Sequence, residues 1–178
     1  MKLALLSLLA AGVAGTAGAQ SGSFYGDIGY TFQSIDTGIE GVDDIDIGAI
    51  TGHGGYQFTP NLAAEGEISV GVQDEDFDLG AGAEGSVSLN YLLGAYGRVQ
   101  GNLTPQLQVF ARAGIVNAEL EAEADGLGSE SDSETGAGYG VGAEYMFDAV
   151  NGVRVDYTRY DIEDLESDAF TIAYKRKF

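Results

Sequence analysis

Ten ionisable side chains fall on one side of segments in which apolar residues alternate with small or polar ones. They are Asp27, Glu65, Glu67, Arg98, Arg112, Glu144, Arg154, Asp156, Lys175 and Lys177. Successive side chains of a β-strand point to opposite faces, so residues of one parity share a face. Five acids and five bases on one face predict a network of ion pairs. Such a network can act as a structural plug or can line a narrow conducting pore.

Catalytic chemistry has little support in the sequence. The chain contains one histidine, His53, and no cysteine, so a cysteine nucleophile is excluded. A lipid-modifying enzyme with a serine nucleophile could carry a motif such as G-x-S-x-G, and the sequence contains none. His53 lies on the polar parity of its segment, so we expect it to pack inside the fold. We predict that the protein is not an enzyme and needs no cofactor.

The charged residues are distributed over eight alternating segments. These span residues 24–34, 45–58, 62–73, 87–99, 107–115, 138–147, 153–158 and 170–178. Alternation over such lengths predicts β-strands, and the sequence as a whole predicts an all-β, eight-stranded antiparallel up-and-down barrel. In the second segment, Ile45 and Ile47 are out of phase with the residues that follow, which predicts a β-bulge.

The connections between the segments alternate in length. Short turns follow the second, fourth and sixth segments, and two of them share the pattern Thr-Pro-x-Leu, at residues 59–62 and 104–107. Long connections follow the other segments. Residues 36–46, 74–84, 119–134 and 161–168 contain 22 of the 28 acidic residues and no Lys or Arg. Short periplasmic turns and long extracellular loops are typical of a transmembrane β-barrel of the outer membrane.

The two faces of the strands differ in the side chains that they offer to lipid. The apolar face has no charge in the middle of its strands, and its aromatic residues gather at the short-turn end. We interpret these aromatic residues as an interfacial girdle, formed by Phe24, Tyr56, Phe58, Tyr145 and Phe147 and continued by Tyr174 and Phe178. A soluble, lipocalin-like barrel with its apolar face inside is the alternative, but it gives no reason for this clustering.

The N-terminus has the layout of an export signal. Lys2 precedes an apolar run over residues 3–13, and Ala17-Gly18-Ala19 forms a small-residue cleavage site. The run is too short to span a bilayer as a helix. We therefore predict a signal peptide over residues 1–19 and one barrel domain over residues 20–178. The formal net charge of −20 argues against a nucleic-acid partner.

The chain resembles the small outer-membrane β-barrel proteins, the porin family that includes the OmpA transmembrane domain and OmpX. The matching residues are Gly55-Tyr56-Gln57-Phe58 before a tight turn and the last segment, residues 170–178, which ends in Phe178. The resemblance implies a location in the outer membrane of a Gram-negative cell. It also implies an assembly signal for the barrel-assembly machinery, formed by Phe170, Ile172, Tyr174 and Phe178, and it allows a small conductance.

One explanation of the acidic connections involves no ligand: they form a solvated, self-repelling rim that resists aggregation. Carboxylates also bind Ca²⁺, and Asp74, Asp76 and Asp78 have the opening spacing of a calcium loop. However, Leu79 and Gly85 stand where that loop needs glycine and glutamate. We expect no specific metal site, but weak and shared binding of divalent cations that bridge the rim to outer-membrane lipid and lipopolysaccharide.

The sequence therefore predicts a monomeric outer-membrane protein with a structural or surface-interaction role. A narrow, cation-preferring porin-like channel is the second hypothesis, because ionised residues line the predicted interior. A lipid-modifying barrel enzyme is the third.

Overall fold

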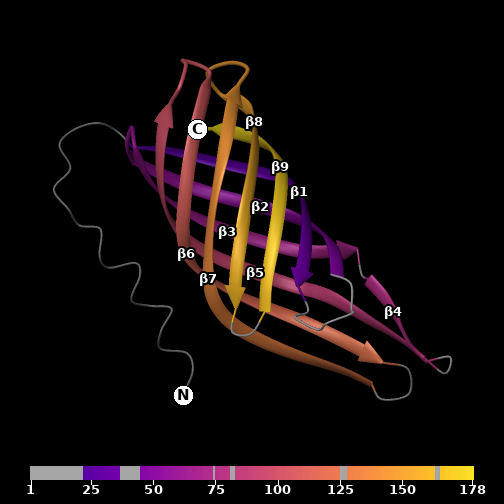
Figure 1. Cartoon of the computed structure of the whole chain (residues 1–178). Coiled ribbons are helices and arrows are strands. Elements are labelled where there is room, and N and C mark those ends of the chain that lie inside the picture. Colours follow the sequence, from indigo (N-terminus) through magenta and orange to yellow (C-terminus); the bar gives the residue numbers. More distant parts are fainter. Residues whose placement is uncertain (1–21, 37–44, 74, 81–82, 125–127, 163–164) are drawn as a thin grey trace.

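The computed structural model describes residues 22–36, 45–73, 75–80, 83–124, 128–162 and 165–178. Over these residues the chain forms nine strands: β1 (Ser23–Asp36), β2 (Ile45–Thr59), β3 (Leu62–Gln73), β4 (Glu75–Gly80), β5 (Ala83–Asn102), β6 (Leu107–Ala124), β7 (Gly128–Met146), β8 (Asn151–Ile162) and β9 (Leu165–Lys177). All but β4 belong to a closed antiparallel barrel, and β4 pairs with the beginning of β5. The predicted eight-stranded barrel is confirmed (Figure 1).

The strands follow one another around the barrel in sequence order. β1 pairs with β2 and also with β9, so the first strand meets the last, and β3 pairs directly with β5. A closed circle of strands satisfies the backbone hydrogen bonds within the wall, which a strand structure in lipid requires. No helix among the described residues is long and apolar enough to cross a bilayer.

Side chains of the turn residues fix the short turns between β2 and β3, β5 and β6, and β7 and β8. Thr59 Oγ1 accepts a hydrogen bond from the backbone N–H of Leu62, and Thr104 Oγ1 accepts one from that of Leu107. The repeated Thr-Pro-x-Leu pattern thus makes the same hydrogen bond, from the Leu backbone N–H to the Thr hydroxyl, in both turns. In the third turn, Asp148 accepts hydrogen bonds from the Asn151 side chain and from backbone N–H groups, which lower the pKa of its carboxyl. These turns lie at the upper end of the barrel in Figure 1.

The opposite end differs from the prediction of long loops. Most of residues 74–84, 119–134 and 161–168 lie in strands, and β5, β6 and β7 have 20, 18 and 19 residues. A tilted membrane strand needs only about 9–11. These strands extend beyond the rest of the barrel together with β4, toward the lower right of Figure 1. Of the predicted first long loop, residues 37–44 lie outside the described residues.

The register between β6 and β7 avoids directly opposed acids. The glutamates of β6 lie opposite serines of β7, in the pairs Glu119–Ser133, Glu121–Ser131 and Glu123–Ser129. Directly opposed like charges destabilise a sheet, and this register avoids them in β6 and β7. The other two acidic segments pair although Asp78 lies opposite Glu84 and Asp161 opposite Glu166. The loop prediction was wrong because acidic content alone does not prevent strand pairing.

The predicted bulge lies in the pairing of β2 with β3, but β2 itself does not change phase. Gly48 pairs with Gln73 and Ala49 with Gly71, so the extra residue is Val72 on β3. Ile47 is buried inside the barrel on the same parity as Ala49. The expectation that Ile47 turns to the outer face is therefore wrong, because the interior is apolar at this level.

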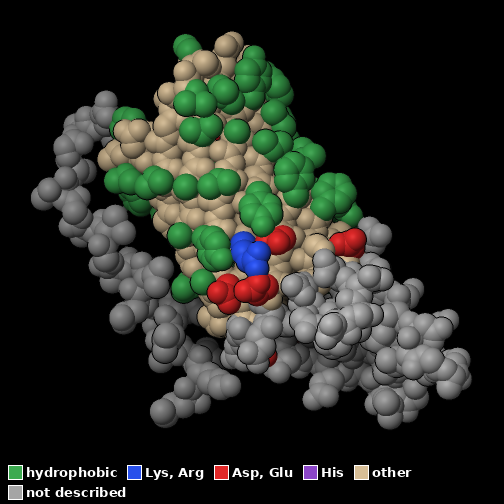
Figure 2. Space-filling view, in the orientation of Figure 1, with side chains coloured by type: hydrophobic (Ala, Val, Ile, Leu, Met, Phe, Trp, Pro, Cys, Tyr) green, Lys and Arg blue, Asp and Glu red, His purple; other side chains and the backbone are tan. Residues whose placement is uncertain are grey.

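The outer wall of the barrel is apolar and exposed. Large hydrophobic side chains with a third or more of their surface accessible occur on every barrel strand, as Figure 2 shows for one face. Charged side chains appear on that face only toward its lower edge, near the long ends of the strands. This is the surface that hydrocarbon, rather than water, solvates.

The exposed aromatic residues form two groups, whereas the sequence predicted one. The five predicted girdle residues are exposed or half-exposed at the short-turn end, and Phe24 and Phe58 each contact the Tyr56 ring. A second exposed group lies toward the other end and consists of Phe32, Tyr139, Tyr157 and Phe170. Phe24 and Phe32 are separated by eight steps of β1, or about 26 Å along the strand. With the usual strand tilt this corresponds to a height of roughly 20 Å, close to the apolar band of such barrels.

Candidate functional site

The barrel interior holds nine of the ten predicted charged side chains. The buried carboxylates are Asp27, Glu65, Glu67, Glu144 and Asp156, and the buried cations are Arg98, Arg112, Arg154 and Lys175. Lys177 differs from the prediction. It is half-buried next to the end of β9, and none of the ion pairs among the described residues includes it. The strand has nearly ended at this position, so its side chain lies outside the charged layer.

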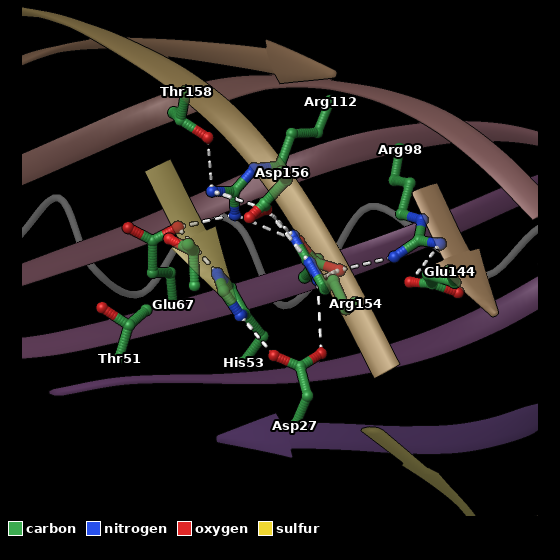
Figure 3. A network of polar contacts seen from close by, with 12 residues as sticks. Asp27, Thr51, His53, Glu67, Arg98, Arg112, Glu144, Arg154, Asp156 and Thr158 are labelled. Carbon is green, nitrogen blue, oxygen red and sulfur yellow. Dashed lines mark hydrogen bonds and ion pairs between the residues drawn. The ribbon is translucent and has the colours of Figure 1, made fainter. Parts of the chain in front are cut away.

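Glu65 on β3 is the centre of this network, and Figure 3 labels the three arginines that contact it. Its two carboxylate oxygens accept hydrogen bonds from Nη1 and Nη2 of Arg154, at 2.8 and 3.0 Å. Arg98 and Arg112 donate to the same carboxylate at 3.0 and 3.1 Å, and the Tyr25 hydroxyl donates at 2.8 Å. The arginines come from β5, β6 and β8, so the carboxylate of Glu65 on β3 links four strands of the barrel.

Arg154 is fully buried and is neutralised by more than one acid. Besides Glu65, its guanidinium donates to Asp156 on the same strand, from Nε at 3.0 Å and from Nη2 at 2.6 Å. A longer contact of 3.3 Å reaches Asp27 on β1. Residues two apart on one strand share a face, so Asp156 reaches the guanidinium without distortion of β8.

The network continues toward both ends of the barrel. Toward the short turns, Glu144 Oε1 lies 2.7 Å from Arg98 Nη2 and 2.7 Å from Lys175 Nζ. Toward the long ends, Arg112 Nη1 lies 2.6 Å from Glu67 Oε2. Every side chain in these pairs is at most 2% exposed.

Aromatic rings stack against the guanidinium groups of the arginines inside the barrel. The Phe110 ring lies 3.8 Å from the Arg98 guanidinium carbon and 4.6 Å from that of Arg154, and the Tyr96 ring lies 4.4 Å from that of Arg112. These are cation–π distances. A Cβ at Gly142 would come within 2.4 Å of Phe110. Gly138 and Gly142 of β7 thus leave room for the Tyr96 and Phe110 rings.

Two neutral layers lie between the charged layer and the long ends of the strands. A row of hydroxyl groups crosses four strands, with Oγ–Oγ distances of 2.8 Å for Ser69–Thr51, 2.6 Å for Thr51–Thr31 and 2.8 Å for Thr31–Thr171. Beyond this row, buried apolar side chains dominate the interior, together with a buried hydrogen bond of 2.7 Å from Gln33 Nε2 to Ser167 Oγ. The buried apolar cluster is Ile35, Ile47, Ala49, Leu89, Leu92, Tyr96, Val116, Ala118, Tyr160, Ile162 and Ala169. Side chains from six of the eight barrel strands meet in this cluster.

Other predicted sites lie on the wall or outside the described residues. The proposed assembly signal, Phe170, Ile172, Tyr174 and Phe178, is exposed along the outer face of β9 and at the end of the chain. Asp76 and Asp78 belong to β4, and Asp74 lies outside the described residues. Within the described ranges, no group of three or more His, Cys, Asp or Glu residues could hold a metal ion.

The predicted network contained no aromatic residue, although the alternation places three of them inside. Tyr25, Tyr96 and Phe110 lie on the polar parity of their strands, next to Asp27, Arg98 and Arg112 in the alternation. All three are buried in the structure, and their contacts with the arginines could not be predicted from parity.

Two of three comparisons relate this chain to known proteins. A family model described as "Outer membrane protein beta-barrel domain" matches residues 3–178. The crystal structure of Ail, the attachment invasion locus protein of Yersinia pestis, superposes with a TM-score of 0.67 at 16% identity, over 89% of this chain and all of that chain. The neisserial surface protein A superposes with 0.63 at 12% identity, over 89% and all of the two chains. The comparison with curated proteins found no match.

A second Ail structure, in complex with the heparin analogue sucrose octasulfate, superposes with a TM-score of 0.63 at 15% identity, again over 89% of this chain and all of that chain. At these identities the structural comparisons establish the fold.

We predict that Glu65→Ala will strongly destabilise the barrel. Removal of one partner of a buried charge pair costs about 3–5 kcal/mol, and here three guanidinium groups lose a carboxylate at once. Urea unfolding of the refolded protein in detergent measures the change. Glu166→Ala is the matched control, because its side chain is 53% exposed and its pairing with Arg159 is at the surface. Equal unfolding midpoints for the two variants would contradict this role of Glu65.

Proposed function

Because this chain belongs to the outer membrane protein β-barrel family and lies in the outer membrane, we propose that it is a structural and surface-interaction protein. In this proposal the barrel is a rigid, closed anchor whose long-strand end presents acidic residues outside the cell. The observation that carries the proposal is the filled interior. The charged layer and the apolar cluster each bring together side chains from opposite sides of the barrel.

The filled interior supports a structural role over conduction. An eight-stranded barrel has an interior that side chains just fill. In this protein the arginines are held by carboxylates and by rings, and the apolar cluster offers no ligand to a hydrated ion. A cation-preferring channel would need both layers to rearrange.

The acidic end suggests the chemistry of the partners. Residues 119–134 alone contain seven acids and no base, so this end repels polyanions. Ail was crystallised with a sulfated heparin analogue, whereas the present chain suits cationic partners or divalent cations that bridge carboxylates to the phosphates of lipopolysaccharide.

The last strand supports a further proposed contact, with the barrel-assembly machinery, through the exposed residues Phe170, Ile172, Tyr174 and Phe178.

Planar-bilayer recording tests the closed interior. We expect the purified wild-type barrel to give no steady openings, because paired charged side chains and the buried apolar cluster occupy its interior. A bilayer without protein and one containing Glu65→Gln are the controls. Steady cation-selective openings of the wild type that Glu65→Gln abolishes would contradict the structural role and support the channel.

Calorimetric titration tests the divalent cation. We expect the refolded protein in lipopolysaccharide-containing vesicles to release or take up heat with millimolar Ca²⁺, since its outer end is rich in carboxylates. The triple variant Asp74→Asn, Asp76→Asn, Asp78→Asn should retain most of this heat if the binding is shared over the rim. No heat beyond that of protein-free vesicles would rule out Ca²⁺ as a partner.

A further inference from the structure

His53 lies between two carboxylates inside the barrel. The register places it opposite Asp27 on β1 and opposite Glu67 on β3. Its Nδ1 is 2.5 Å from Asp27 Oδ1, and its Nε2 is 3.1 Å from Glu67 Oε2. All three side chains are completely inaccessible to solvent. The ring is therefore held on both sides by groups of the same kind (Figure 3).

The hydrogen-bonding capacity of these groups decides how many protons they carry. An ionised carboxylate only accepts hydrogen bonds, and a neutral imidazole has one N–H and one bare nitrogen. A neutral ring would satisfy one carboxylate and direct a lone pair at the other. Two ring N–H groups, one for each carboxylate, satisfy both contacts, and a ring with two N–H groups is an imidazolium.

A charge count inside the barrel leads to the same result. Among the residues whose burial the structure describes, the buried charged side chains are five carboxylates and only four cations in arginine and lysine. An isolated charge in a low-dielectric interior is costly, so a deficit of one cation needs compensation. The interior is electroneutral when His53 supplies the fifth positive charge.

The groups around His53 agree with this assignment. β1 contributes Asp27 and β3 contributes Glu67 and Glu65, while β6 and β8 contribute Arg112 and Arg154. Arg112 contacts Glu67 and Arg154 contacts Asp27, but each arginine also pairs with another carboxylate, Glu65 for Arg112 and Asp156 for Arg154. The Tyr160 hydroxyl donates to Glu67 Oε1 at 2.6 Å, which leaves Oε2 for the ring and for Arg112.

We propose that the barrel interior contains a proton-binding site, in which His53 is held as an imidazolium between Asp27 and Glu67 and completes the charge balance of the network. His53 is then a structural cation, with a role beyond the neutral packing that the sequence suggested. The proposal is independent of whether the barrel conducts ions.

Nitrogen NMR tests the proposal without any substitution. The chain has a single histidine, so a tag-free sample labelled with ¹⁵N-histidine gives the signals of this ring alone. Near neutral pH, in detergent or in nanodiscs, we expect two protonated ring nitrogens and no bare one. One protonated and one bare nitrogen, the pattern of a neutral ring, would overturn the proposal.

A double-mutant cycle provides a second and independent test. His53→Gln removes the proposed cation and Asp27→Asn removes one carboxylate, so each alone leaves a net charge. We expect each single variant to lower the urea midpoint, and the double variant to recover part of the sum. His53→Gln combined with Glu166→Gln is the control, because it changes the total charge equally at an exposed position and should show no recovery. Additive effects in the first cycle would contradict the charge-balance role, and the NMR result stands even if a variant does not fold.

Discussion

Ionised side chains inside a narrow barrel must find partners inside it, and this requirement organises the rest of the structure. Glu65 meets Arg154, which lies 89 residues further along the chain, as well as Arg98 and Arg112 on two other strands. Because an unpaired buried charge is costly, each of these contacts favours the same closed arrangement of strands. The network therefore specifies the barrel in addition to filling it.

The layers of the interior divide the molecule into parts with different roles. The charged layer joins the strands by ion pairs, the hydroxyl row lies between it and the long ends of the strands, and the apolar cluster lies beyond that row. Exposed apolar side chains on the outer wall provide the contact with lipid. The described acidic residues thus have two environments, since those inside neutralise cationic side chains, whereas Glu166 at the long end of β9 is exposed.

Alternation along the strands was sufficient to predict much of this arrangement. The parity of Arg98, Arg112 and Arg154 placed them inside, and the structure gives each of them a buried carboxylate. The partners could not be predicted, because the pattern of a single strand contains no information on which strands face each other across the barrel. The apolar cluster was missed for a different reason. Ile47 was judged out of phase by its hydrophobicity, whereas the interior changes from charged to apolar along the axis. The lengths of β6 and β7 could not be predicted either, because the register that places Glu opposite Ser is a property of two strands together.

The orientation of the strand faces is tested most directly by NMR of alanine methyl groups in nanodiscs that contain a lipid spin-labelled in its tail. Ala63 and Ala64 are neighbours on β3 at nearly the same depth, and so each serves as the control for the other. Ala63 is 5% exposed and points inward, while Ala64 is exposed on the wall. The spin label should broaden the Ala64 signal and leave that of Ala63 sharp. A broadened Ala63 signal beside a sharp Ala64 signal would mean that the charged face, and not the apolar one, meets the lipid.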